Sequence, residues 1–160
     1  MLQRMRTIWV IRAGVGNSLA EDFRRLGVVG LTVPFPGDAS EATSKEIVDA
    51  LSRSHPVQAP GMAAFLRRLV HDVAITDVVV TPGGVDAGVL VGEITGSYRY
   101  DGLPAIPELC HQRSVLWNHR VLWMTIPTAL RRALSAPVPI YRPGAQQALS
   151  DVLVDGNRPS

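Results

Sequence analysis

Cysteine and long apolar runs are scarce in this sequence, and each scarcity excludes a class of protein. Cys110 is the single cysteine among 160 residues, so the chain cannot form an internal disulfide. This use of cysteine is typical of a reducing compartment. The chain also lacks the roughly 18 consecutive apolar residues that a membrane-spanning helix needs. The apolar stretch Ile8–Ile11 is too short for the core of a signal peptide. We therefore expect a cytoplasmic protein with no membrane association.

Lysine is nearly absent as well. Lys45 is the only lysine, so 15 of the 16 lysine and arginine residues are arginine. Guanidinium groups bind phosphates and base edges through paired hydrogen bonds, which lysine does not offer. A genomic bias against lysine would explain the same composition, and a net charge of only +2 does not mark a strongly basic nucleic-acid-binding protein. Both interpretations of the arginines stay open.

The sequence has no pattern for a metal or a dinucleotide. One cysteine is too few for a structural zinc site, and the spacing of the histidines matches neither HxH nor HExxH. The loop Gly14–Gly16 lacks the third glycine of a dinucleotide-binding fingerprint. The four histidines are His55, His71, His111 and His119. We therefore expect neither a metal nor a cofactor.

The segment Ile75–Tyr100 predicts two strands joined by a tight hairpin. The run Val78–Val80 is β-branched and stops at the turn sequence Thr81–Gly84. Apolar residues resume after the turn, and Gly92 interrupts them in a way that marks a β-bulge or a close backbone approach. The hairpin then brings the polar and aromatic run Tyr98–Asp101 to one rim. We expect the rest of the chain to pack against this hairpin.

Local patterns predict further strands and helices before the hairpin. Ser18 is expected to cap a first helix with Glu21 as its capping-box partner, and Gly27 to end that helix. Apolar residues in helical spacing between Met62 and Val73 are the strongest helical signal in the chain. The expected strands are residues 7–12 and 28–33, and the expected helices are residues 18–26, 44–54 and a segment after Pro60.

After the hairpin, alternating apolar and polar residues predict a strand over Cys110–Leu116. Asn118–His119 is expected to be a turn, followed by a separate strand over Val121–Ile126. The remaining expected elements are a helix at residues 128–134, a short strand at 138–142 and a last helix at 145–154.

The order of these elements predicts the fold class. The strands do not alternate regularly with helices, as a parallel sheet would require. An apolar fraction of 46% and a mean hydropathy of +0.14 suffice for a well-filled core. We therefore predict an α+β fold, a small mixed and strongly bent β-barrel with helices packed on one side. This domain is expected to span residues 1–144, and residues 145–160 to form a C-terminal helix with a tail or linker.

One enzyme hypothesis rests on Cys110. The sequence VVVTPGG, residues 78–84, resembles the oxyanion loop of PfpI-type cysteine hydrolases, and Leu109–His111 resembles their nucleophile elbow. A histidine next to a cysteine can activate the thiol. However, residues 88–95 predict a strand where that family has a helix, and Gln112 replaces the elbow glycine. A cysteine hydrolase is therefore kept as the alternative to a protein without catalytic activity.

Several segments, taken in order, resemble a family of nucleic-acid-binding domains. They cover nearly the whole chain and are IWVIRAG (Ile8–Gly14), LGVVGLTV (Leu26–Val33), ITDVVVTP (Ile75–Pro82), VGEITGSYRYD (Val91–Asp101), HQRSVLW (His111–Trp117) and LRRALSAPVPIYR (Leu130–Arg142). Their ordered sum resembles the PUA-like N-terminal domain of Mrr-type and related modification-dependent restriction proteins. That domain is similar in turn to the EVE and YTH readers of modified bases.

The resemblance implies a PUA-like fold and a non-catalytic role, the recognition of modified DNA in a bacterial, type IV-like restriction or antiviral defence system. Such domains enclose a flipped modified base in a pocket. The pocket of these folds lies between the end of the first strand, the loop after the second strand and the end of the strand that starts the hairpin. Transferred to this chain, the implied base pocket is Arg12, Gly14, Asn17, Thr32, Phe35, Thr81 and Gly83.

The resemblance also suggests roles for individual side chains. Arg12 or Asn17 would contact the edge of the base, and Phe35 would stack on its face. A candidate aromatic wall consists of Trp9, Tyr98 and Trp117, although core or half-core positions are favoured for the two tryptophans. The expected contacts to the DNA backbone are Arg99, Arg113 and Arg120.

The partners that follow are modified double-stranded DNA and a nuclease domain or nuclease partner protein, since a recognition domain alone cleaves nothing. A homodimer stays open. A domain that binds modified RNA or a free nucleotide would be built on the same fold, because a fold does not determine a ligand.

Overall fold

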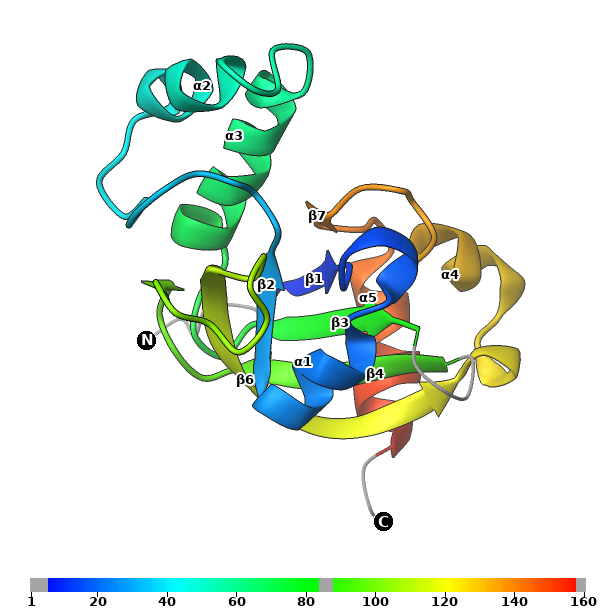
Figure 1. The fold of residues 1–160 in the computed structure, drawn as a ribbon. Coiled ribbons are helices and arrows are strands. Elements are labelled where there is room, and N and C mark those ends of the chain that lie inside the picture. Colours follow the sequence, from blue (N-terminus) through cyan, green and yellow to red (C-terminus); the bar gives the residue numbers. More distant parts are fainter. Residues whose placement is uncertain (1–5, 84–87, 158–160) are drawn as a thin grey trace, which may run out of the picture.

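The computed structural model describes residues 6–83 and 88–157. In this part of the chain seven strands form one sheet in the order β2-β6-β4-β3-β1-β7, with β5 paired to β6 (Figure 1). The strands are β1 (Ile8–Ile11), β2 (Val28–Leu31), β3 (Val78–Pro82), β4 (Gly88–Ile94), β5 (Arg99–Tyr100), β6 (His111–Leu122) and β7 (Ile140–Tyr141). The helices are α1 (Ala20–Leu26), α2 (Ser44–Ser52), α3 (Ala59–Arg67), α4 (Thr128–Ala133) and α5 (Gln146–Leu149).

The sheet is mixed, as predicted. β1 and β3 run parallel, with Ile8 opposite Val78, and every other pairing in the described ranges is antiparallel. β3 and β4 form the expected hairpin, with Val80 opposite Val91. The register of β4 against β6 shifts between Val91 and Gly92, so a bulge does occur beside Gly92, although its extra residue, Asn118, belongs to β6. Of the hairpin turn, residues 84–87 lie outside the described residues.

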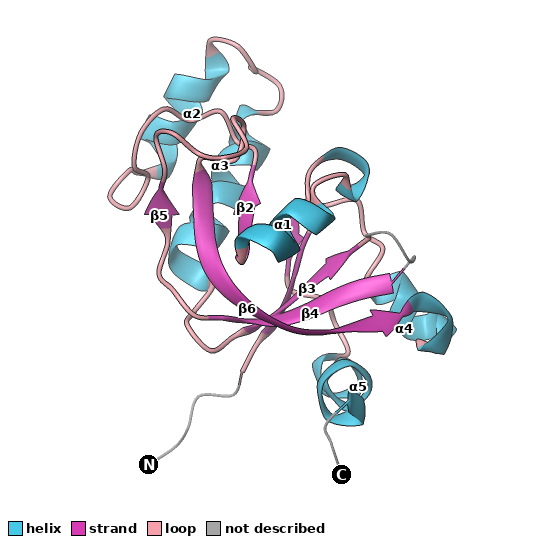
Figure 2. Cartoon of the chain, turned by 60° about the horizontal axis from the view of Figure 1, so that its bottom comes forward, coloured by secondary structure: helices cyan, strands magenta, loops and turns pink. Residues whose placement is uncertain are grey.

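The prediction of two short strands separated by a turn at Asn118–His119 is wrong. His111–Leu122 is one strand of 12 residues that bends strongly along its length (Figure 2). Its first residues pair with β2 and β5, and its later residues pair with β4. Because both halves find partner strands, β6 continues past this point, and Asn118 is the extra residue at a bulge in its pairing with β4. Residues after Leu122 do not continue the expected strand but form a 3-10 turn over Trp123–Thr125.

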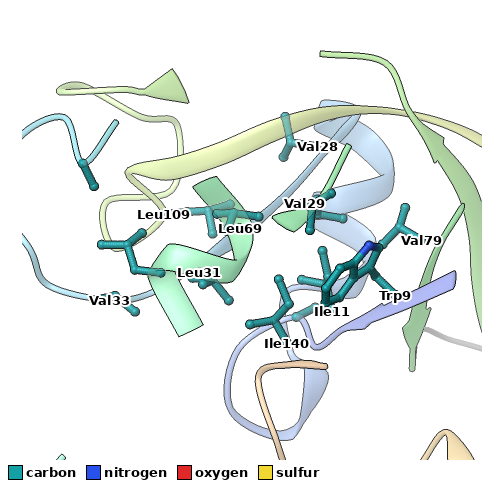
Figure 3. Packing of buried hydrophobic residues seen from close by; sticks show 14 of the residues in the cluster. Trp9, Ile11, Val28, Val29, Leu31, Val33, Leu69, Val79, Leu109 and Ile140 are labelled. Carbon is teal, nitrogen blue, oxygen red and sulfur yellow. The ribbon is translucent and has the colours of Figure 1, made fainter. Parts of the chain in front are cut away.

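Alternation along β1 explains why the core has two parts. Trp9 and Ile11 face a cluster that includes buried residues of α1, α2 and α3, and Figure 3 shows both beside Val79 and Val29. Ile8 and Val10 face a second cluster, which includes Leu130 of α4 and residues of the C-terminal helix. Successive side chains of a strand point to opposite faces, so an all-apolar strand needs cover on both. The predicted class is confirmed, a strongly bent mixed sheet with helices alongside, and α4 and α5 cover its second face.

The N-terminus of α1 differs from expectation, whereas α2 begins at Ser44 as predicted. Ser18 does not cap α1; Leu19 occupies that position without a side-chain cap, and Glu21 pairs with Arg24 and Arg120 instead. A capping box does occur at α2, between Thr43 and Glu46. At the other end of α1, Gly27 adopts φ 65° as the predicted cap, a left-handed conformation that glycine reaches without steric cost.

The C-terminal segment packs against the sheet. α5 and the π-helical turn Ser150–Val154 follow one another, and Leu149 and Leu153 are fully buried in the second cluster. The side chain of Gln146 bonds to the backbone N–H and carbonyl of Ile8. The helix predicted at 145–154 is therefore present and packs against β1. Within the described ranges, no helix is both long and apolar enough to cross a membrane.

Candidate functional site

Four neighbouring strands bring their ends together at one end of the sheet. β1 and β3 are parallel, and their register places Arg12, which follows β1, beside the end of β3 at Pro82. In β4, Gly88 lies opposite Leu122, the last residue of β6. The turn that carries Trp123 therefore starts beside the last residue of β3 and the first residue of β4. The helix α4 lies at the same end of the sheet (Figure 1).

A first cavity, which we call the glycine-loop cavity, lies where the loop after β1 meets the end of β2. Its volume is about 260 Å³. The loop is closed by two hydrogen bonds at Ala13, whose N–H donates to Asn17 Oδ1 (3.2 Å) and whose carbonyl accepts from Leu19 N (2.9 Å). Gly14 (φ 73°) and Gly16 (φ 62°) allow this tight loop. The lining residues are Arg12, Gly14, Val15, Gly16, Gly30, Leu31, Thr32, Pro137 and Pro139.

A second cavity, the tryptophan cavity, shares Arg12 with the first and is lined by Asn17 of the same loop. Its volume is about 300 Å³. At Gly83 the backbone has φ 105°, and a Cβ there would lie 2.8 Å from the Cβ of Asn17. Only glycine allows the chain to pass so close to Asn17. The lining residues are Arg12, Asn17, Pro82, Gly83, Gly88, Trp123, Leu134 and Ser135.

Arg12 is the one charged residue among the described residues that line the two cavities. Its backbone N–H donates to Pro139 O (2.9 Å), and its guanidinium Nη1 lies 3.4 Å from Ala136 O. The side chain is half-buried. A guanidinium with no acidic neighbour in the lining favours a ligand with hydrogen-bond acceptors or negative charge.

The structure brings together five of the seven residues predicted for the base pocket, and leaves two out. Phe35 packs against the first core cluster, and its carbonyl lies 2.9 Å from His111 Nε2. Thr81 is fully buried and its hydroxyl donates to Ile11 O (2.8 Å). The Phe35 side chain packs against the core and the Thr81 hydroxyl bonds within it, so neither residue lines the cavities. The five that line them are Arg12, Gly14, Asn17, Thr32 and Gly83.

The aromatic wall expected from Trp9, Tyr98 and Trp117 is not at the cavities. Trp9 is 6% exposed and its indole donates to the buried carboxylate of Asp77 (3.0 Å). Tyr98 lies against His111, and burial raises the pKa of its hydroxyl to about 12. Trp117 donates to Phe23 O (2.9 Å) and lines a separate hollow beside α1. Each indole or phenol has a partner within the protein interior, which is the usual arrangement of a buried polar aromatic group.

Among the described residues that line the glycine-loop and tryptophan cavities, the aromatic one is Trp123, which is not among the predicted site residues. The sequence predicts a strand over Val121–Ile126, because Trp123 and its neighbours Leu122 and Met124 form one apolar run. The turn sequence that follows, Thr125 to Pro127, was the signal that the strand had already ended. Trp123 is half-buried and lies on the wall of the tryptophan cavity.

The three arginines expected at the DNA backbone differ in their surroundings. Arg113 cannot contact a phosphate because it is 4% exposed and donates to the carbonyls of Leu69 and Gly96 as well as Val73. Burial also lowers the pKa of its guanidinium, which nevertheless stays protonated at neutral pH. Arg99 is exposed and bonds to Ser114 and Gln112. Arg120 pairs with Glu21, with 21% of its side chain exposed.

The geometry around Cys110 gives its thiol little activation. Sγ lies 3.5 Å from Pro107 O. The neighbouring His111 is fully buried, with its ring nitrogens bonded to the hydroxyl of Tyr98 and the carbonyl of Phe35. An imidazole with both nitrogens engaged is not free to accept the thiol proton.

A family model matches residues 9–136, a range that contains both cavities apart from Pro137 and Pro139. The chain belongs to the DUF8426 family, a domain of unknown function. No curated protein and no solved structure matches it. Since most of the lining residues lie within the matched range, the cavities belong to the part of the chain that defines this DUF8426 domain.

Proposed function

We propose that this DUF8426 domain is a non-catalytic recognition module for modified DNA, which encloses one modified base in the cavities at Arg12. The observation that carries the proposal is the convergence of Arg12, Gly14, Asn17, Thr32 and Gly83 around the loop after β1. The resemblance to modified-base readers implies these five residues, and they line two cavities that share Arg12.

The dimensions of the cavities suit a single base. Volumes of about 260 and 300 Å³ lie at the lower end of the range of small-molecule sites. In the proposed complex the base ring lies against Trp123 in the tryptophan cavity. Stacking of this kind contributes about 1–3 kcal/mol per base, comparable with the few kcal/mol needed to unstack it. The glycine-loop cavity, which shares Arg12, would accommodate the substituent that distinguishes the modified base.

The charge of the lining supports the same ligand. Arg12 can donate two hydrogen bonds to adjacent acceptors on a base edge, the geometry by which arginine recognises bases. No acidic residue among the described lining residues opposes it. Cleavage of the recognised DNA would come from a nuclease domain or a nuclease partner protein, as in a restriction or defence system.

A binding titration by fluorescence polarisation tests the proposal. The probes are matched duplexes with cytosine, 5-methylcytosine, 5-hydroxymethylcytosine, glucosylated hydroxymethylcytosine, N6-methyladenine or a phosphorothioate linkage, all at one stated salt concentration. We expect a preference of about tenfold or more for one probe, equivalent to about 1.4 kcal/mol. The preference should be lost in Arg12→Ala and in Trp123→Ala.

Arg53→Ala is the matched control for charge, because Arg53 is exposed at the end of α2, outside the lining of both cavities. It removes the same charge and should retain the preference. Equal, weak binding of all six probes that disappears together as salt rises would contradict the proposal. Retention of the preference in both Arg12→Ala and Trp123→Ala would place the site elsewhere.

A further inference from the structure

The turn after β6 holds the half-buried Trp123 between two exposed apolar side chains. Leu122 is 54% exposed and Met124 is 88% exposed, whereas Trp123 lines the tryptophan cavity. Isolated exposed apolar residues are ordinary on protein surfaces. Here, however, they flank Trp123. Among the described residues that line either cavity, Trp123 is the one aromatic residue.

This turn is held rigidly. The hydroxyl of Thr125 donates to Leu122 O (2.7 Å), and the N–H of Ile126 donates to Trp123 O (3.1 Å). Ile126 is 1% exposed, and its carbonyl accepts from Nε of Arg131 on α4 (2.7 Å). Met124 therefore projects into solvent from a fixed turn. Because the backbone of the turn is already ordered, little backbone conformational entropy is lost when this side chain binds a partner.

The charge around the turn favours a polyanion as its partner. Between Leu122 and Ser150 the sequence contains no aspartate or glutamate, and α4, which follows the turn, carries Arg131 and Arg132. Arg132 lies on α4, close in sequence to the cavity-lining Leu134, and is exposed. Excess positive charge beside an apolar projection is the combination by which proteins bind and deform double-stranded DNA.

We propose that Met124 is a wedge that enters duplex DNA in the space vacated by the base held against Trp123. This inference rests on the proposed function and deepens it, because it specifies double-stranded DNA with an extruded base as the partner. When a base leaves the helix, its neighbours lose a stacking surface. An apolar side chain in the gap restores part of that contact. A single strand has no such gap, so the contribution of Met124 is specific to duplexes.

Each of the six probes is titrated as the labelled duplex and as the labelled strand alone. Met124→Ala is expected to weaken binding of the preferred duplex by about tenfold and to leave binding of the single strand unchanged. Met124→Leu keeps an apolar side chain of similar size and should bind the duplex like the wild type. Leu103→Ala is the control, because Leu103 is 95% exposed but lies in the loop between β5 and β6, near the opposite end of β6.

A mismatch opposite the modified base provides a second readout. It lowers the cost of extrusion, so it should restore part of the duplex affinity lost in Met124→Ala. Equal loss on duplex and single strand would overturn the wedge and make Met124 part of the pocket. Wild-type affinity of Met124→Ala for the duplex would overturn it as well. In both cases Trp123→Ala still tests the pocket by itself, whereas absence of any preferred probe for the wild type defeats both proposals.

Discussion

The hydroxyl of Tyr98 lies 2.6 Å from Nδ1 of His111 and holds that ring in place. The Tyr98 oxygen accepts from Ala39 N (3.1 Å), and its own proton is donated to Nδ1 when the imidazole is neutral. Nε2 faces the carbonyl of Phe35, which can only accept, and must therefore carry the ring proton. Burial favours the neutral form of this imidazole, and the chain of hydrogen bonds ties the long loop before α2 to β6.

Burial lowers the pKa of His111, although the carbonyl of Phe35 and the carboxylate of Asp38 oppose the shift. Below about pH 6.5 the unfolded chain takes up a proton at this histidine that the folded protein does not. We therefore expect the free energy of unfolding to fall as the pH drops below about 6.5, by about 1.4 kcal/mol for each unit of pKa depression, and to level off below the folded pKa. Urea unfolding between pH 5 and 8 measures this.

His111→Gln supplies the control for the pH dependence, since it removes the titrating group. Its stability should vary less between about pH 5 and 7 than that of the wild type. Tyr98→Phe leaves Ala39 N–H and His111 Nδ1 without their partner and should cost about 1–3 kcal/mol. A wild-type stability that is flat across this range would contradict the assignment of His111 as neutral and buried.

Arg113 is predicted to stabilise the fold and to have no part in DNA binding. Its buried guanidinium bonds to the carbonyls of Leu69 and Val73 around the end of the helical segment that follows α3, and to that of Gly96. Arg113→Met leaves these acceptors without a donor and should cost about 3 kcal/mol or more. Thermal unfolding measures the loss. A variant as stable as the wild type, but with weaker DNA binding, would show that the phosphate role originally expected of Arg113 is correct.

Gly92 is predicted to tolerate no side chain. A Cβ there would lie 2.7 Å from Cγ1 of Val115 and 2.8 Å from Leu116 O, at the bulge that bends β4 against β6. Gly92→Ala should lower the free energy of unfolding by about 1–3 kcal/mol through overpacking. Gly144→Ala is the control, because nothing lies within 4 Å of the position of its Cβ. Equal stability of the two variants in chemical denaturation would contradict this packing.

If Arg99 contacts the DNA backbone, its contribution to DNA affinity is predicted to come from its charge alone. Arg99→Ala should weaken all duplex probes alike and reduce the slope of log affinity against log salt by about 0.9. Arg12→Ala should instead remove the preference among probes. Titrations at several salt concentrations separate the two effects. If Arg99→Ala changes the preference but not the slope, its assignment to the backbone is wrong.

Cys110 is predicted to react with iodoacetamide at neutral pH no faster than a free cysteine derivative. The imidazole of His111 is bonded to Tyr98 and Phe35 and cannot accept the thiol proton. Mass spectrometry of the alkylated protein over time gives the rate. Rapid, selective modification of Cys110 would favour the cysteine hydrolase and weaken the case for a module without catalytic activity.

The sequence by itself determined the elements whose signal is local. Apolar and β-branched runs located β1, β3 and β4. Gly27 marked a helix end, where glycine reaches the left-handed conformation easily, and Gly92 marked a bulge or a close backbone approach. The sequence also shows that Arg12 and the glycine loop directly follow an apolar strand. A strand that is covered on both faces lies within a sheet, so the loop after it lies at a sheet end.

Tertiary structure alone decided which of these side chains face the cavities. Arg113 and Arg99 have similar local sequence surroundings, yet one is buried under a helix 40 residues away and the other is exposed. Trp123 lines a cavity because β6 continues unbroken to Leu122 and ends beside Gly88, a pairing that no local pattern reports. Burial and strand partnership depend on residues distant in the chain, whereas periodicity records only the preferences of neighbours.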